Sequence, residues 1–464
     1  MMRPGFRAAP RTGEAATNTP RCPICGKAAP ADQFGFVECD CGWGGPGDPV
    51  ESARGVARWL TLLDRRVATM IARRELARIA RAKSASGGGV FYIAALSVMS
   101  SIIYLIVGAL LAGSVILFAQ TVMAQLWVGA VLDGAVVAYV IWALFGFPQR
   151  VADIVAPLSR HPQLEALVSE VAETIGAQTP QWVILFPGAN FYVVRRMLWG
   201  HASTPQIALG VGVAGLAHMN DHELRAVLAH ELAHYQYAHT FFARFFGGAE
   251  AALYKIIDGI QAGISTNYKR DYMARRRTSS SLAAAIGVLI IWVLSLPLRM
   301  LWFAFHLLRM RQSRSEEYEA DAAAIEAYGP QAFIYGLTAV QVAAATLRGA
   351  GLGIRQEMVK HNNPNFFAEL RRHYAELPPS YLSEMRIRAA QGYRTVESSH
   401  PISPDRIRAA MLLQAPEPPA EEPWPVYDII TPVDAPDTEA LERRLTDILL
   451  DRIYSSGSGR RRRR

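Results

Sequence analysis

Residues 90–147 constrain this chain more than any other stretch, because they carry one charged side chain, that of Asp133. The run is too long for one helical crossing of a hydrocarbon layer about 30 Å thick, but it suits two. A polar break around Thr121 marks the turn. We therefore predict a transmembrane helical hairpin over residues 85–148, with Asp133 facing the other helix or a polar cavity. A buried hairpin in a soluble core is the alternative.

The segment before the hairpin, residues 51–84, predicts a basic amphipathic helix in which arginines far outnumber acidic residues. We expect it to lie on anionic lipid headgroups, with a solvated helix as the alternative. By the positive-inside rule, these arginines and Arg150 place both ends of the hairpin in the cytoplasm. The net charge of +8 and the mean hydropathy of +0.12 fit contact with a membrane surface. No specific nucleic acid is expected, and the first thirty residues show no apolar core of a cleavable signal peptide.

The sequence His230-Glu231-Leu232-Ala233-His234 matches the pattern H-E-x-x-H. Residues four apart share one face of a helix, so both histidines can bind one metal ion. Glu231 is not a ligand in such sites, but it stands where it can take a proton from water. Asn220 or Asp221 can cap the helix. Chance occurrence of the pattern is the alternative.

A zinc enzyme of this kind needs a third protein ligand and an open coordination position. His239 lies about 140° around the helix from His234, so we expect it at the surface or behind the ligands. Glu317 is the better candidate, because Asp321 and Arg314 can share its helical face and orient the ligands. The alternative is a charged surface helix.

All four cysteines lie within residues 1–50, as two closely spaced pairs. They are Cys22, Cys25, Cys39 and Cys41. Two such pairs can complete a tetrahedral zinc site, so we predict a disordered start followed by a zinc ribbon with a structural zinc ion. Two disulfides or a redox pair are the alternatives, and a reducing cytosol argues against disulfides. Whether the ribbon binds a protein partner stays open.

Three β-strands are predicted before the H-E-x-x-H helix, at residues 181–186, 190–194 and 207–213. Small sheets beside such helices commonly bind a peptide substrate as one more strand. Asn190, Phe191 and Tyr192 are the candidate substrate-binding edge, although these strands could serve only to pack the core. Residues 151–180 are expected to form a helical entry segment.

The chain between the two halves of the site must return Glu317 to the side of the membrane that holds His230. Residues 282–308 are apolar, and we expect a membrane-associated segment there that dips in and turns back near Pro297. Two full crossings are the alternative. They would place the basic loop that begins at Lys269 outside the cytoplasm, against the positive-inside rule. Residues 415–464 are expected to form a Pro-rich linker, a helix and an Arg-rich tail.

Three separated motifs resemble those of the M48 peptidases, membrane-embedded gluzincins that include HtpX and the CAAX-processing Ste24 proteases. The motifs are HELAH, SRSEEYEAD after it, and SHPISPDRI near residue 400. Asn190-Phe191-Tyr192 stands where the family has an edge strand with smaller residues. The zinc ribbon is an addition to the family core. The resemblance implies a mainly helical α+β fold, with a membrane-anchored gluzincin domain over residues 149–414 and a small β-sheet.

The resemblance also implies residue roles. His230, His234 and Glu317 would bind one catalytic zinc ion, and Glu231 would act as general base. His400 and Arg406 would lie near the cleft, where Arg406 would steady a substrate carbonyl or the oxyanion.

The function we expect is a membrane-bound zinc-dependent endopeptidase of the inner (cytoplasmic) membrane. It would cross the membrane several times, face the cytoplasm and cleave membrane or misfolded proteins in quality control. One alternative is a processing protease for lipidated C-termini, which a deep intramembrane chamber would favour. Another is a non-catalytic membrane adaptor that recruits partners through the zinc ribbon.

Overall fold

The computed structural model divides into two compact units that are described separately. The sheet unit comprises Met1–Ser86, Arg150–Ala238 and Arg314–Arg464, and the hairpin unit comprises Gly87–Gln149 and His239–Ser313. The described residues are 20–33, 35–82, 89–145, 153–196, 206–237, 240–274, 281–349, 351–413, 415, 424–433 and 438–461. His239, the start of the chain, most of the Pro-rich linker and residues 462–464 of the Arg tail lie outside them.

The sheet unit contains a four-stranded mixed sheet in the order β1-β2-β4-β3. Its strands are β1 (Ile154–Pro157), β2 (Trp182–Phe186), β3 (Phe191–Arg196) and β4 (Gln206–Gly212). Strands β2 and β4 pair in parallel, and the other two pairs are antiparallel. Strand β3 is therefore an edge strand. Strand β1 was not predicted, because its four residues are extended through pairing with β2 rather than through a local pattern.

Two helices show how the sequence builds the core beside this sheet. Helix α4 (Pro162–Ile175) buries Leu164, Leu167, Val168 and Val171, at the spacing of one helical face. Helix α6 (Asp221–Tyr237) begins with a capping box. The Asn220 side chain accepts from the Glu223 amide at 2.9 Å, while the Glu223 carboxylate accepts from the Asn220 amide at 3.2 Å.

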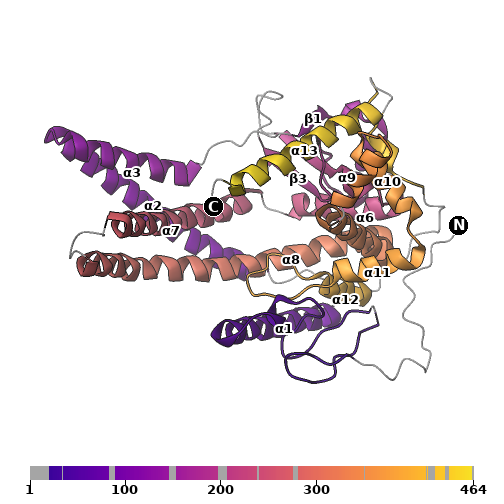
Figure 1. The fold of residues 1–464 in the computed structure, drawn as a ribbon, viewed down its shortest axis with the longest axis horizontal. Helices are drawn as coiled ribbons and strands as arrows, with labels where there is room; N and C mark the ends of the chain where they lie inside the picture. The colour runs from indigo at the N-terminus through magenta and orange to yellow at the C-terminus, as the bar shows by residue number, and fades with distance from the viewer. Residues whose placement is uncertain are drawn as a thin grey trace. The chain divides into compact units, whose positions relative to one another are not determined.

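Further helices of the sheet unit are α1, α5 and α9–α13, most of which are labelled in Figure 1. Their bounds are α1 Gly55–Ala82, α5 Val213–Leu216, α9 Gly351–Lys360, α10 Phe366–Glu376, α11 Pro379–Ala390, α12 Ser403–Leu413 and α13 Thr438–Arg461, with 3-10 turns at Pro49–Glu51, Leu158–Arg160 and Tyr427–Ile430. Helix α13 docks on α10, where buried Glu442 accepts hydrogen bonds from Asn365 and Arg371. The mainly helical α+β prediction is confirmed.

The hairpin unit begins with α2 (Gly89–Met123) and α3 (Trp127–Phe145), which pack on each other and on α7 (Thr240–Ala274). The Thr121 hydroxyl donates to Asp133 at 3.0 Å, so the acid does face the other helix of the hairpin. Two helices in the described part of the chain are long and apolar enough to span a membrane, within Tyr92–Met123 and Leu289–Leu347. Their apolar stretches are largely exposed, unlike the core helix of a soluble protein.

Helix α8 (Ser281–Gly349) corrects one prediction, because it runs through Pro297 without turning back. A proline removes one hydrogen bond from a helix, and an apolar helix tolerates this where neighbouring groups satisfy the freed backbone. Within α8 only Gly329 departs from helical geometry, with φ +81° just before Pro330. The expected dipping hairpin near Pro297 is therefore wrong.

Candidate metal centre

Three side chains from two distant helices converge at one point. The Nε2 atoms of His230 and His234 lie 3.1 Å apart. Glu317, on α8, places Oε1 3.2 Å from the His234 nitrogen and Oε2 3.7 Å from the His230 nitrogen. Zinc bonds of about 2.0–2.1 Å at tetrahedral angles separate ligand atoms by about 3.3 Å, so this donor set fits one zinc ion.

Glu231 lies beside this centre on α6. Burial raises the pKa of its carboxyl above the ordinary value, and the nearby Glu317 raises it further, while the two histidines lower it. A carboxylate with a raised pKa accepts a proton from water more readily than an ordinary one near neutral pH. The general-base role of Glu231 stays a prediction, for which its position beside His230, His234 and Glu317 is the structural basis.

Behind the ligands, Asp321 and Arg406 form a second layer. The Nδ1 atom of His230 lies 2.9 Å from Asp321, which orients the ring so that Nε2 can face the metal. Arg406 donates to both Asp321 oxygens, at 2.9 and 2.5 Å, and its Nη1 atom lies 3.4 Å from Glu317. Although burial opposes the charge of Arg406, Asp321 and Glu317 raise its pKa above the ordinary range.

Arg406 thus occupies a different place from the one that the sequence suggested. The expectation was a side chain steadying a substrate carbonyl, but the guanidinium is buried among Asp321, Glu317 and His230. These contacts make it a positioning residue for the ligands. His400 does lie at the site, where its Nδ1 atom is 2.7 Å from Glu317 while 65% of its side chain stays exposed.

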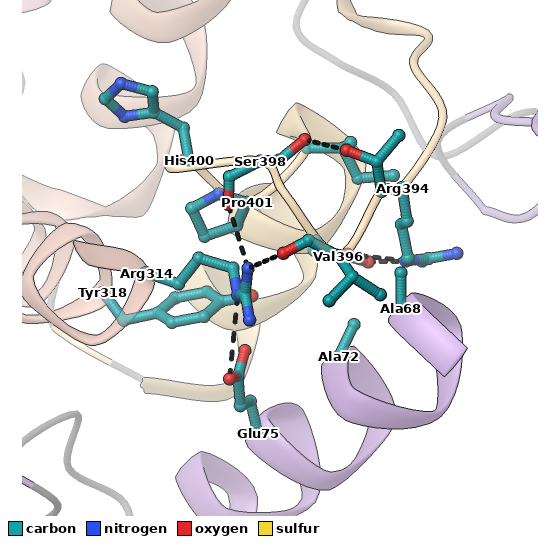
Figure 2. Close-up of a pocket in the computed structure, with 13 residues that line it drawn as sticks. Ala68, Ala72, Glu75, Arg314, Tyr318, Arg394, Val396, Ser398, His400 and Pro401 are labelled. Atoms are coloured by element: carbon teal, nitrogen blue, oxygen red, sulfur yellow. Dashed lines mark hydrogen bonds and ion pairs between the residues drawn. The ribbon is translucent and has the colours of Figure 1, made fainter. Parts of the chain in front are cut away.

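Arg314 is also placed differently. It donates to the carbonyl oxygens of Val396 and Ser398, at 3.2 and 2.9 Å, and lies 3.9 Å from Glu75 of α1 (Figure 2). It therefore supports the loop that leads to His400. The adjoining cavity of about 20 Å³ holds no more than a water molecule and is too small for a peptide. No sequence pattern predicted the role of these two carbonyl groups.

The predicted substrate strand lies beside the ligand helix, because β3 packs against α6. Its three predicted residues differ in accessibility. Asn190 is exposed, Phe191 is buried in the core, and Tyr192 is half-buried against Gly210 of β4. The Phe191 side chain therefore packs the core, which leaves Asn190, Tyr192 and the backbone as the accessible part of the predicted edge.

The four cysteines form a second metal-binding group, with their sulfur atoms within 4.8 Å of one another. Cys22 and Cys41 lie 3.5 Å apart, as do Cys25 and Cys39. Zinc bonds of about 2.3 Å to sulfur imply separations of about 3.8 Å, so the set fits a structural zinc ion. The Lys27 backbone amide lowers the pKa of Cys25 to about 7, whereas burial raises the pKa values of Cys39 and Cys41 above the ordinary value.

Asp321→Asn is expected to weaken metal binding at the His230 centre about 10- to 100-fold, the usual effect of losing a hydrogen-bond partner of a ligand. The amide keeps the shape but removes the charge that pairs with Arg406 and orients His230. Competition with a chromophoric zinc chelator measures the change. Asp447→Asn, on α13, is the control, and an affinity equal in both variants would contradict the assignment.

Comparison with protein families gives a match that includes the residues of this site. The family model for peptidase family M48 matches residues 158–413, more than half of the chain. No curated protein sequence matches. Among solved structures, the chain is similar to the crystal structure of Ste24p from S. mikatae, with 19% sequence identity and a TM-score of 0.29. That match covers 77% of this chain and 76% of the other, and its TM-score is too low to support a conclusion.

Proposed function

This chain belongs to peptidase family M48, and we propose on that premise that it is a membrane-bound zinc endopeptidase. The observation that supports this most is the convergence of two nitrogen atoms and one carboxylate oxygen beside Glu231. We propose His230, His234 and Glu317 as ligands of a catalytic zinc ion, and the four cysteines as ligands of a structural one. A non-catalytic adaptor has no need of a complete ligand set with a base beside it.

A bound zinc ion supplies a Lewis acid that polarises a peptide carbonyl and makes water more acidic. The protein's own groups do the rest. Glu231 accepts the proton of the attacking water and returns it to the leaving amine. Asp321 and Arg406 hold His230 and Glu317 in place, so that little reorganisation is needed during the reaction.

Strand β3 supports an extended polypeptide as the substrate. It is an edge strand next to α6, so its outer backbone groups are placed to pair with a peptide strand. Such pairing recognises the backbone and depends little on sequence, which suits unfolded or misfolded segments. The apolar helices α2 and α8 support a membrane protein. The basic residues of α1 support a site on the cytoplasmic side of the inner membrane. The role we propose there is quality control.

The test uses the purified full chain in detergent with two substrates, a permanently unfolded polypeptide and a farnesylated C-terminal peptide. We expect cleavage at internal bonds of the polypeptide, loss of cleavage after zinc chelation, and recovery when zinc is added back. Mass spectrometry of the products identifies the bonds. Cleavage restricted to the farnesylated peptide would show a processing protease instead. No cleavage by the zinc-loaded chain would favour the adaptor.

A further inference from the structure

The zinc ribbon makes extensive contacts with other parts of the sheet unit. They involve the 391–408 segment, which runs from the end of α11 into α12. This segment supplies His400 and Arg406, the two residues that contact Glu317 from outside the ligand helices. Most of it between α11 and α12 has no regular secondary structure. Its conformation must therefore be fixed by neighbouring parts of the protein, since ordering a loop costs conformational entropy.

The first set of ribbon contacts is made by Gln391. Its side-chain amide accepts from the Val37 backbone amide at 3.3 Å and donates to the Val37 carbonyl at 3.0 Å. The same nitrogen donates to the Gly44 carbonyl at 2.5 Å. These bonds join the start of the 391–408 segment to the ribbon backbone on both sides of the Cys39–Cys41 turn.

An ion-pair cluster forms the second set. Glu38, which immediately precedes Cys39, lies 2.7 Å from Arg394 and 3.2 Å from Arg408. Both arginines also pair with buried Asp405, at 2.5 and 3.2 Å. Asp405 immediately precedes Arg406, so the cluster directly adjoins a cysteine ligand at one end and the residue that positions the ligands of the peptidase site at the other.

Apolar packing forms the third set. Phe36 of the ribbon is buried in the main hydrophobic core of the sheet unit. At Gly44 the backbone approaches Tyr393 so closely that an added Cβ would lie 2.7 Å from the tyrosine Cβ. The ribbon is therefore part of the sheet unit and not a tethered module.

Helix α1 ties the ribbon and the segment together. Its Asp64 accepts from the Val396 backbone amide at 3.1 Å, and its Arg66 donates to the Cys41 carbonyl at 3.2 Å. Figure 2 shows Arg314 in contact with the Val396 and Ser398 part of this loop and, on its other side, with Glu75 of α1. The loop is thus held by the ribbon through Gln391 and Arg394, and by α1 through Asp64.

We propose that the cysteine-bound metal of the ribbon positions the peptidase site: it holds the 391–408 segment, and with it His400 and Arg406, in the active arrangement. This rests on the proposed function. The ribbon's own apolar core is small, centred on Trp43 and Val50, so its fold depends on the metal. Loss of that metal frees Glu38 and Val37, and the segment loses its partners in the ribbon. The ribbon zinc thereby becomes a condition for full activity.

Three full-length variants test this. Cys25→Ser/Cys39→Ser removes two sulfur ligands. Glu38→Gln leaves the cysteines intact and removes only the charge that pairs with Arg394 and Arg408. Asp40→Asn is the matched control, because Asp40 lies in the same turn but pairs with Arg73 at the surface, where 78% of its side chain is exposed. For each variant we would measure zinc per chain, backbone amide exchange in residues 391–408, and kcat and KM on the unfolded polypeptide.

The double cysteine variant is expected to lose one zinc ion, to exchange faster in residues 391–408, and to show a kcat lower by roughly tenfold. Glu38→Gln keeps both zinc ions, and its kcat falls about two- to fivefold, as a partly exposed ion pair allows. Glu38→Asp should restore part of the loss, and Asp40→Asn should match the wild type. Loss of one zinc without faster exchange would overturn the proposal. If the wild type itself is inactive, the proposed function fails, while the exchange result still decides whether the ribbon holds the segment.

Discussion

Glu231→Gln is expected to lower the rate of polypeptide hydrolysis by about 10²- to 10⁴-fold, the range that general acid–base groups contribute. Glutamine has nearly the same shape as glutamate but cannot accept the proton of the attacking water. The side chain is not one of the three converging ligand atoms, so the zinc content should stay at the wild-type value. The result would separate the chemical step from metal binding.

The measurement is a comparison of kcat with zinc per chain for the two proteins under zinc saturation. Glu173→Gln, an isosteric change at an exposed position of α4, serves as the control and should behave like the wild type. Equal turnover by Glu231→Gln and the wild type would remove Glu231 from the mechanism. It would also indicate that any observed proteolysis came from a contaminant.

Glu317→Gln is expected to release the catalytic zinc ion, with an affinity loss of more than about 100-fold, because changes behind the ligands alone cost 10- to 100-fold. The neutral amide is a poorer ligand than the carboxylate. Hydrogen bonds from His234 and His400 and the charge of Arg406 outweigh the burial of Glu317 and hold its pKa below the ordinary range. It is therefore ionised and ready to bind metal at neutral pH.

Glu316→Gln is the matched control, since it makes the same change one residue away on α8. Zinc per chain should fall from about two to about one in Glu317→Gln and remain at about two in Glu316→Gln, because the ribbon keeps its own ion. Hydrolysis should fall with the loss of the metal. Retention of both ions by Glu317→Gln would mean that another residue completes the catalytic site.

The parts of the structure that were predicted correctly rest on short-range patterns. The Asn220 cap, the helix at α4 and the strands at β2, β3 and β4 each follow from residues within a few positions of one another. The pairing of Cys22 and Cys25 with Cys39 and Cys41 follows from the requirement of a tetrahedral site for four sulfur atoms. In each case local chemistry leaves few alternatives.

The parts that were not predicted depend on distant partners. Strand β1 exists because β2 lies beside it, and α8 continues through Pro297, where sequence reasoning expected a turn. Arg314 and Arg406 bear the same charge, and the sequence predicted both to lie near the metal site. The first supports the Val396–Ser398 loop and the second lies behind the ligands, because of where α1 and α12 pack. The spacing of the cysteines does not predict that the ribbon packs against the main core through Phe36.

The most direct test of the central claim is anomalous diffraction at the zinc edge from crystals of the full chain. We predict one peak among the four cysteines and a second about 2.0–2.2 Å from Nε2 of His230, Nε2 of His234 and an oxygen of Glu317. A map without the second peak, or with a peak bound by the histidines while Glu317 lies away from it, would contradict the claim that these three residues share one metal ion.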